Sequence, residues 1–358
     1  MESKQSTEGK TIPVKNDDVQ ALAENAAAEL TAEAIQRYIR PDLESPNDMV
    51  VVAHHDHGES IPVIDLARLL DSQTSQKEAA VLKYACEDWG FFQVENHGIP
   101  DTVLEKMRNN MECFFRLPLD ERKKFRQLLP GDVLVDSENR TLEWSDNFGL
   151  ITQPPRDRDL TAWPTTPVNC RESIESYSSE VMRITHSLVQ MIAKNLGVDD
   201  PDKIRDTYCS QALGIACYPA CPVAHDKVLG VSPHSDVSLL TVVWELNHVQ
   251  GLQIKRHGAW VPIKPHPKAL VVNVGDILEI LTNGKYQSIE HRVTVNPHKE
   301  RLSITAFHMP KVDMSVGPLP EIAGGAELKK YKTLRVDEII AFSSKHEGKK
   351  AKYGLFSI

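Results

Sequence analysis

The sequence predicts an α+β fold, in which helices flank a core built as a double-stranded β-helix, or jelly roll. Short apolar runs at Leu252 to Lys255, Trp260 to Ile263 and Ala269 to Val274 are separated by glycine, proline and asparagine residues that favour turns. Polar and apolar residues alternate from Arg301 to Phe307, which is the period of a half-buried strand. Strands of this length with closely spaced turns indicate two packed sheets. The amphipathic stretch from Arg171 to Leu196 indicates a long flanking helix.

The amino-terminal part is expected to be a polar extension followed by mixed strands and helices. Residues 1 to 58 are polar except for one helical stretch near Val19 to Arg40, which is rich in the helix formers Ala and Glu. The segment from Ile61 to Ile99 reads as strand, helix, strand, with the helix at Lys77 to Trp89. Apolar residues then recur at helical spacing between Pro100 and Phe125.

The carboxyl-terminal half is expected to hold the β-rich core. After the long helix, which ends near Gly197, a shorter helix is predicted from Asp202 to Ser210. The block from Gln211 to Phe307 is predicted to be mainly strands. A last helix is predicted from Val336 to His346, beginning near Asp337.

Two histidines and one aspartate are the candidate metal ligands. His234 and Asp236 are two residues apart at the start of a predicted strand, so both side chains can face one metal ion. His291 precedes another alternating stretch, and strands of a jelly roll can return to the same mouth. Two imidazoles and one carboxylate suit a non-haem Fe(II) site with open coordination positions. The alternatives are a chance H-x-D match and a hydrogen-bonded structural histidine at a strand start.

The motif Arg301-Leu302-Ser303 is a candidate anion site. Arg301, Ser303 and Thr305 share one face of the predicted strand. An arginine among apolar neighbours needs a partner, because an unpaired buried charge is costly, and a carboxylate matches its planar fork. The alternative is a structural salt bridge between Arg301 and a carboxylate of the protein itself.

Composition limits the classes of partner. The chain has 358 residues, enough for a large core, and a formal net charge of −9 at pH 7, which does not favour nucleic-acid binding. No apolar run reaches the roughly 18 residues of a membrane span, and the polar start Met1 to Ser6 lacks a signal-peptide core. The six cysteines show no disulfide-framework spacing. We therefore expect a cytoplasmic monomer with free thiols that binds neither nucleic acid nor membrane.

The order H-x-D, His, R-x-S resembles the plant soluble 2-oxoglutarate/Fe(II)-dependent dioxygenases. The resemblance runs from about Ile61 to Met309. It is strongest to the branch of codeine and thebaine O-demethylases and norcoclaurine-synthase-like oxygenases, and more distant to anthocyanidin synthase. The further segments similar to that family are Ile61–Leu66 (its opening strand), Trp89–Gly98 (its W-G-F-F-x-x-x-N-H-G signature), Tyr218–Pro222 (Y-P-x-C-P), Gly251–Gln253 and Asn273–Asp276.

The resemblance implies specific roles for six residues. It makes His234, Asp236 and His291 the iron ligands and therefore the catalytic residues. It assigns the distal carboxylate of 2-oxoglutarate to the pair Arg301 and Ser303, and it makes Tyr218, the tyrosine of the Y-P-x-C-P turn, a further contact of the co-substrate. His97, in the amino-terminal signature, is interpreted as structural.

The resemblance also implies a substrate pocket, whose residues are matched by position. The small residues Gly149 and Gly214 indicate room for a bulky, flat molecule. Phe307 and Met309, which follow Arg301 on one strand face, indicate an apolar wall. The alternative for each is ordinary core. The set is Asn147, Phe148, Gly149, Gly214, Phe307 and Met309.

The reaction implied by the resemblance couples decarboxylation of 2-oxoglutarate to succinate with oxidation of a substrate C–H bond by O2, with ascorbate as reductant. The substrate is expected to be a small apolar plant specialised metabolite or hormone. Hydroxylation at an O-methyl carbon would release formaldehyde and demethylate it. The implied regions are 1–58 (polar extension), 59–168 (amino-terminal dioxygenase region), 169–210 (helical connection), 211–311 (jelly-roll dioxygenase core) and 312–358 (carboxyl-terminal helical segment).

Three departures from the family pattern keep other functions open. Ala216 stands where an asparagine is usual. The link from Lys124 to Trp144 is short, and Leu128–Asp132 replaces the usual glycine-aromatic-glycine segment. The stretch from Tyr218 to His234 is one residue longer than is common. One alternative is an ascorbate-using oxidase of the aminocyclopropane-carboxylate-oxidase type. The other is a non-catalytic small-molecule binder, which Ala216 favours and the intact ligand set opposes.

Overall fold

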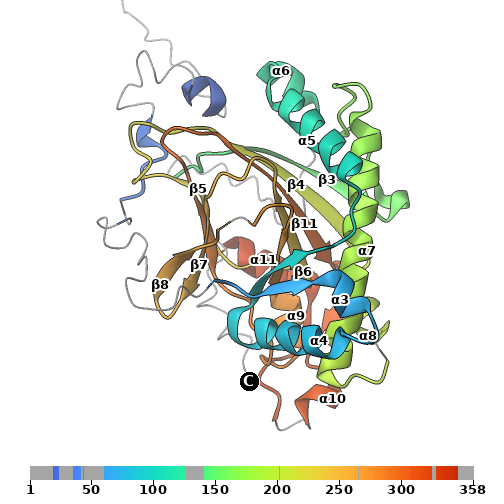
Figure 1. Ribbon diagram of the computed structural model, residues 1–358. Coiled ribbons are helices and arrows are strands. Elements are labelled where there is room, and N and C mark those ends of the chain that lie inside the picture. The colour runs from blue at the N-terminus through green and yellow to red at the C-terminus, as the bar shows by residue number, and fades with distance from the viewer. Residues whose placement is uncertain are drawn as a thin grey trace, which may run out of the picture.

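The β-rich core consists of two facing sheets, as a computed structural model of the chain shows (Figure 1). The structure describes residues 19–23, 35–41, 43, 60–125, 141–200, 202–264, 266–324 and 328–345. The larger sheet has seven strands in the order β1-β2-β9-β6-β11-β4-β3, and the smaller has four in the order β5-β10-β7-β8. Two packed sheets flanked by helices confirm the predicted α+β jelly-roll fold.

The strands of the core follow the predicted apolar and alternating runs. The large sheet contains β1 (Val63–Asp65), β2 (Phe91–Glu95), β3 (Asp146–Gln153), β4 (Ser210–Tyr218), β6 (Leu240–Glu245), β9 (Leu270–Val274) and β11 (Arg301–Met309). The small sheet contains β5 (Leu229–His234), β7 (Leu252–Arg256), β8 (Ala259–Pro262) and β10 (His291–Thr294). A separate two-stranded ribbon pairs β12 (Ser315–Val316) with β13 (Leu334–Arg335).

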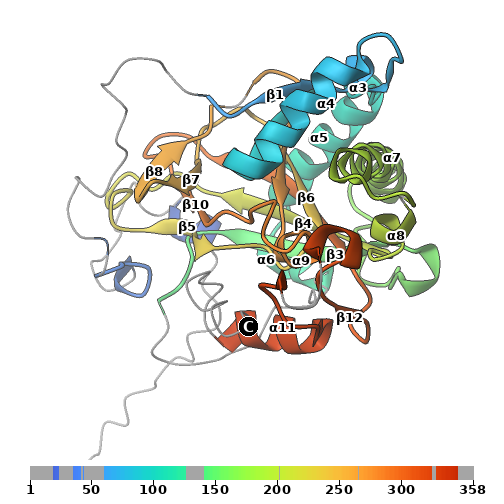
Figure 2. The same ribbon diagram turned by 90° about the horizontal axis from the view of Figure 1, so that it is seen from below.

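Helices cover the outer face of the large sheet. Among them, α7 (Cys170–Leu196) buries residues at helical spacing, including Ile174, Val181 and Leu188. It lies on the side away from β7 and β8 in both views (Figures 1 and 2). The other helices are α3 (Leu66–Leu70), α4 (Ser75–Tyr84), a π-helical turn at Ala85–Trp89, α5 (Asp101–Phe115), α6 (Leu119–Arg122), α8 (Asp202–Arg205), α9 (Asp276–Leu281), α10 (Pro320–Ala323) and α11 (Val336–Lys345).

Two helix predictions differ from the structure. The helix expected from Asp202 to Ser210 ends at Arg205, because sheet pairing takes over the end of this segment: the Cys209 N–H donates to Met309 O, at 3.0 Å. Inside the β-rich block the chain also forms α9, all six of whose residues are buried. Because all six positions are buried, Asp276 and Glu279 included, no exposed face gives this segment a helical period that separates it from a buried strand.

Two parts of the predicted organisation lie partly outside the described residues. Of the helix expected near Val19 to Arg40, residues 19–23 and 35–36 are helical, and residues 24–34 are outside the description. Leu128–Asp132 is also outside it. The segment around Tyr38 packs on Trp144, with ring centroids 5.1 Å apart, and the Arg40 N–H donates to Lys227 O. The amino-terminal extension therefore contacts the core next to β5.

Strand register decides which side chains meet at the mouth of the core. The β11–β4 ladder pairs Arg301 with Tyr218 and Ser303 with Ala216. In the small sheet, the β5–β10 ladder pairs His234 with His291. No described helix is both long enough and apolar enough to cross a lipid bilayer.

Candidate active site

The structure brings the three candidate metal ligands together. One ligand atom from each of His234, Asp236 and His291 lies within 4.8 Å of the other two. Asp236 Oδ1 is 3.4 Å from His234 Nε2 and 3.6 Å from His291 Nε2. His234 ends β5 and His291 begins β10, so antiparallel pairing of these strands places the two imidazoles side by side, with ring centroids 4.2 Å apart.

Hydrogen bonds to the protein settle which atom of each ligand is free. His234 Nδ1 lies 2.8 Å from Ser232 O, and His291 Nδ1 lies 3.0 Å from Ile289 O. A carbonyl oxygen only accepts, so each Nδ1 carries the hydrogen and donates it, which leaves Nε2 of each ring as the atom available to a metal ion. Asn273 Nδ2 donates to Asp236 Oδ2 at 2.8 Å, which leaves Oδ1 facing the histidines.

The charges within this cluster are coupled. Burial favours the neutral form of Asp236, yet the two imidazoles and the Asn273 hydrogen bond hold its pKa well below the usual range. Burial disfavours protonated His234, but the neighbouring carboxylate outweighs it and raises the His234 pKa. Burial, and then the charge on His234, lowers the pKa of His291. Without a metal ion, a proton on His234 balances Asp236, and a cation that binds here displaces it.

The donor set fits a divalent iron ion. Two neutral imidazole nitrogens and one carboxylate oxygen form the facial set that Fe(II) oxygenases use, with coordination positions left open for reactants. Both histidines already have the backbone hydrogen bonds that orient metal-binding imidazoles, and the carboxylate is oriented by Asn273. The three residues could therefore hold Fe(II) without rearrangement of their surroundings.

Arg301 is deeply buried and already has a carboxylate partner. Its exposed fraction is 2%, and its Nη2 and Nε donate to Glu245 Oε1 at 2.7 and 3.3 Å. Its Nη1 donates to Ser303 Oγ at 3.2 Å, and its Cζ lies 5.1 Å from the ring centroid of Tyr218. Burial raises the pKa of Tyr218, so its hydroxyl stays protonated and can donate. The arginine, serine and tyrosine thus meet in one buried cluster, with Glu245 on one edge of the guanidinium.

The sequence interpretation missed Glu245 and gave Asn273 no role. Glu245 ends the apolar run of β6 and lies beside Ser303 in the β6–β11 ladder. The signal was a carboxylate directly after Val242–Trp244, where an apolar residue would continue the strand. Asn273 was recognised as part of a family block, but only the fold shows that it contacts Asp236.

Gly251, the first residue of the family block Gly251–Gln253, packs directly against Arg301. A Cβ atom at this glycine would stand 2.8 Å from Arg301 Cδ and 2.8 Å from Thr294 O. Both separations are too short for real carbon contacts, so any other residue would displace the arginine or the β10 backbone. The glycine allows the close approach that Arg301 needs.

The six predicted substrate residues divide into two groups. Gly149 pairs with Gly214 in the β3–β4 ladder, and Gly214 pairs with Thr305 on the same face as Arg301. Phe307 continues this face, and a Cβ at Gly214 would lie 3.2 Å from its Cε2. Asn147 and Met309 lie farther along the same face in opposite directions, at the row of Ala216 and at the end of β11.

Phe148 lies on the other face of β3. Its ring packs on Phe114 of α5, with centroids 4.5 Å apart, and on Phe115 at 6.1 Å. Successive residues of a strand point to opposite faces, so Phe148 faces the helices while its neighbours Asn147 and Gly149 share the other face. Phe148 is therefore part of the helix-side core and not of the predicted pocket wall.

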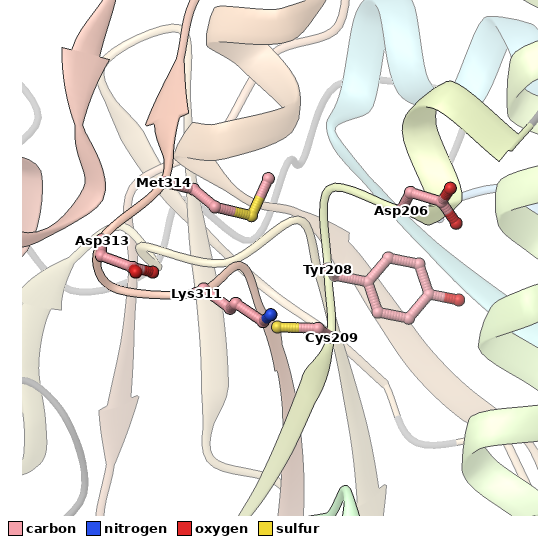
Figure 3. A pocket seen from close by; sticks show the side chains of 6 residues that line it. All are labelled: Asp206, Tyr208, Cys209, Lys311, Asp313 and Met314. Atoms are coloured by element: carbon pink, nitrogen blue, oxygen red, sulfur yellow. The ribbon is translucent and has the colours of Figure 1, made fainter.

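A hollow at the other end of the same strands is separate from this cluster. It has a volume of about 540 Å³ and is lined by Asp206, Tyr208, Cys209, Lys311, Asp313 and Met314 (Figure 3). Cys209 precedes β4 and Lys311 follows β11, whereas Tyr218 and Arg301 lie at the far ends of these strands. None of the residues predicted for metal, co-substrate or substrate binding lines it.

Together, the jelly roll, the two-histidine, one-carboxylate cluster and the nearby buried arginine define a mononuclear non-haem iron oxygenase. Comparison with known families agrees over most of the chain. Residues 209–310 match the 2OG-Fe(II) oxygenase superfamily, and residues 61–169 match the amino-terminal region of the non-haem dioxygenases in morphine synthesis. The chain belongs to the 2OG-Fe(II) oxygenase superfamily, and it is a 2-oxoglutarate- and Fe(II)-dependent dioxygenase.

Several of the relatives that the chain resembles are plant enzymes. It is 42% identical to S-norcoclaurine synthase 1 of Coptis japonica, with 94% of each chain covered, and 39% identical to thebaine 6-O-demethylase of Papaver somniferum, with 85% of each covered. Among solved structures, JOX2 in complex with 2OG, Fe and JA superposes with a TM-score of 0.76 at 32% identity, covering 90% of this chain and 92% of that one. The predictions of family, fold, enzyme class, iron and 2-oxoglutarate are confirmed.

Proposed function

We propose that His234, Asp236 and His291 hold the catalytic iron, that Arg301 and Ser303 hold the distal carboxylate of 2-oxoglutarate, and that Tyr218 also contacts the co-substrate. One observation carries the metal assignment: both free Nε2 atoms and Asp236 Oδ1 converge on one point while every other polar atom of these side chains is hydrogen-bonded. The co-substrate assignment is supported by a buried guanidinium with two hydroxyl-bearing neighbours.

The protein residues orient the reactants around the metal. Bound iron, with 2-oxoglutarate and O2, supplies oxidation of a C–H bond coupled to formation of succinate and CO2. Arg301 and Ser303 fix the far end of the co-substrate by charge and hydrogen bonding. Asn273 keeps Asp236 in a ligating orientation. The face bearing Gly149, Gly214 and Phe307 would contact the substrate, with the Phe307 ring lying against Gly214.

The substrate is proposed to be a small, largely apolar plant metabolite, which the enzyme hydroxylates or O-demethylates. Relatives named thebaine 6-O-demethylase, codeine O-demethylase and flavonoid 7-O-demethylase 1 support an O-methylated or ring-containing compound. The wall is assigned to Asn147, Gly149, Gly214, Phe307 and Met309. Ascorbate is proposed as the reductant that keeps the iron divalent.

The test is a turnover assay with a compound library. Purified protein is mixed with Fe(II), ascorbate and 2-oxoglutarate, and succinate is measured with and without each plant metabolite, while formaldehyde is measured in parallel. We expect one class of compound to raise succinate formation, with formaldehyde released if an O-methyl group is attacked. Oxidation of a substrate with ascorbate alone, independent of 2-oxoglutarate, would contradict the assignment.

We also propose that the enzyme acts as a cytoplasmic monomer that binds neither nucleic acid nor membrane. The net charge of −9 supports the lack of nucleic-acid binding, and the six free cysteines fit a reducing compartment. Sedimentation of the purified chain tests the oligomeric state, and a fluorescent fusion tests the compartment. A stable dimer at micromolar concentration would contradict the first part.

A further inference from the structure

The ion pair between Arg301 and Glu245 lies inside the proposed co-substrate site. The side chains are 2% and 5% exposed, so water screens neither charge. Arginine stays protonated in proteins, and a buried guanidinium needs a counter-charge. Glu245 is therefore an ionised carboxylate, held on the same guanidinium that the co-substrate must reach.

The hydrogen bonds show which part of Arg301 is already used. Glu245 Oε1 accepts from both Nε and Nη2, and Ser303 Oγ accepts from Nη1. A guanidinium has five N–H groups, so one on Nη1 and one on Nη2 lie beyond these three bonds, and the Tyr218 hydroxyl also interacts with the guanidinium. A carboxylate can still bind the end of the fork, but its negative charge then shares one cation with Glu245. Glu245 Oε2 is buried and has no hydrogen-bond partner among the described residues.

We propose that Glu245 is a specificity-determining residue for the co-substrate: it orients Arg301 and its negative charge weakens the binding of a second carboxylate. The proposal rests on the assignment of 2-oxoglutarate to Arg301. The pair is neutral before binding, so a bound distal carboxylate leaves the buried cluster with one net negative charge. The succinate product has the same distal carboxylate and experiences the same repulsion, which favours its release.

The variant Glu245→Gln separates the two effects of the glutamate. Glutamine has the same shape and its carbonyl oxygen can accept from Arg301 Nη2, so the arginine keeps its orientation. The negative charge is lost, and Oε2, which has no hydrogen-bond partner among the described residues, becomes an amide nitrogen. We expect the Kd for 2-oxoglutarate to fall at least fivefold, which is about 1 kcal/mol.

A matched ligand isolates the distal carboxylate. The full-length protein, loaded with Fe(II) under argon, is titrated by calorimetry with 2-oxoglutarate and with 2-oxovalerate, which has a methyl group in place of that carboxylate. We expect Glu245→Gln to tighten 2-oxoglutarate binding and to change 2-oxovalerate binding less than twofold. Equal shifts for both ligands, no shift, or weaker 2-oxoglutarate binding would overturn the proposal.

Glu300→Gln is the matched control. Glu300 directly precedes Arg301, but it is exposed, so loss of its charge is expected to change the Kd less than twofold. If Glu245→Gln does not fold, Glu245→Asn, a shorter neutral amide, is titrated instead with the same expectation. Wild-type protein that binds both ligands equally well would refute the role of Arg301 itself. If the wild type prefers 2-oxoglutarate to 2-oxovalerate but Glu245→Gln does not change either Kd, only the role of Glu245 is refuted.

Discussion

Two groups of buried histidines differ in how many of their ring nitrogens form hydrogen bonds with the protein. His308 lies on the outer face of β11, where Nδ1 is 3.1 Å from Leu240 O and Nε2 is 3.1 Å from Thr185 Oγ1. In the metal cluster, His234 and His291 each use Nδ1 on a backbone carbonyl and keep Nε2 free. A buried histidine with one unused nitrogen beside a carboxylate is a ligand candidate, whereas one with both used is structural.

His97 belongs to the structural group. Its Nδ1 accepts from the Ile99 N–H at 3.1 Å, so Nε2 carries the hydrogen and donates to Lys268 O at 2.9 Å. Burial lowers its pKa, which keeps it neutral in this double role. The interpretation of His97 as structural agrees with this geometry, although the residue lies within a signature motif of the family.

The largest effect is expected from loss of a metal ligand. His234→Ala, Asp236→Ala and His291→Ala should each abolish turnover and reduce bound iron to background, because a three-residue ligand set has no spare member. Each variant should fold, since the two sheets remain packed. Iron content and succinate formation are measured at micromolar Fe(II). His308→Gln is the comparison, and it should keep its iron; near-wild-type turnover in any alanine variant would refute the ligand assignment.

The next largest effect is expected at Arg301, which differs from the ligand histidines because the protein already pairs it. Arg301→Ala removes one partner of buried charge pairs and should weaken 2-oxoglutarate binding by about 2–5 kcal/mol, roughly 30- to 5000-fold. Arg301→Lys should restore only part of the affinity, because an ammonium cannot reproduce the planar fork. The dependence of turnover on 2-oxoglutarate concentration checks both. Unchanged dependence in Arg301→Ala would favour the ascorbate-using type of oxidase.

A smaller effect, on stability alone, is expected at His308. His308→Ala would leave Thr185, Gln211 and a backbone carbonyl without their partner, at a cost of about 1–3 kcal/mol in the free energy of unfolding. Denaturant unfolding measures this cost, and iron content per folded molecule should stay unchanged. Loss of iron from the folded variant would break the distinction between the two groups of histidines.

The same residue predicts a pH dependence of stability. Burial lowers the pKa of His308 to about 4, below the ordinary value of 6.5. Between these two pH values the unfolded chain binds a proton at His308 and the folded chain does not. The free energy of unfolding therefore falls as the pH drops from about 6.5 to about 4. His308→Gln should unfold with a shallower pH dependence than the wild type across this window. Identical slopes would show that His308 is not held neutral.

The residues of the site were predictable from the sequence to different degrees. The ligands and Arg301-Leu302-Ser303 could be found because the chemistry demands these residue types at fixed strand spacing. Glu245 stands out in the sequence as a carboxylate after an apolar run, but its role could not be predicted, because that role depends on the β6–β11 register that places it beside Ser303. The face of Phe148 was also unpredictable without the register of β3, since a shift by one residue reverses every side chain.

The smallest effect is expected on the inward face of β11. It tests the contrast between this face and the helix side of the strand, where His308 lies. Phe307 and His308 are neighbours, so the strand turns one toward the predicted pocket and the other toward the helices. Phe307→Ala should change the ratio of kcat/KM between two competing metabolites by about tenfold. This is the low end of what one apolar contact contributes to discrimination. Iron content and succinate formed without substrate should remain, because Phe307 holds neither the metal nor the co-substrate. All three quantities are measured on the same preparation. If iron and uncoupled turnover fall together with substrate oxidation, Phe307 supports the core as His308 does, and both faces of the strand are structural.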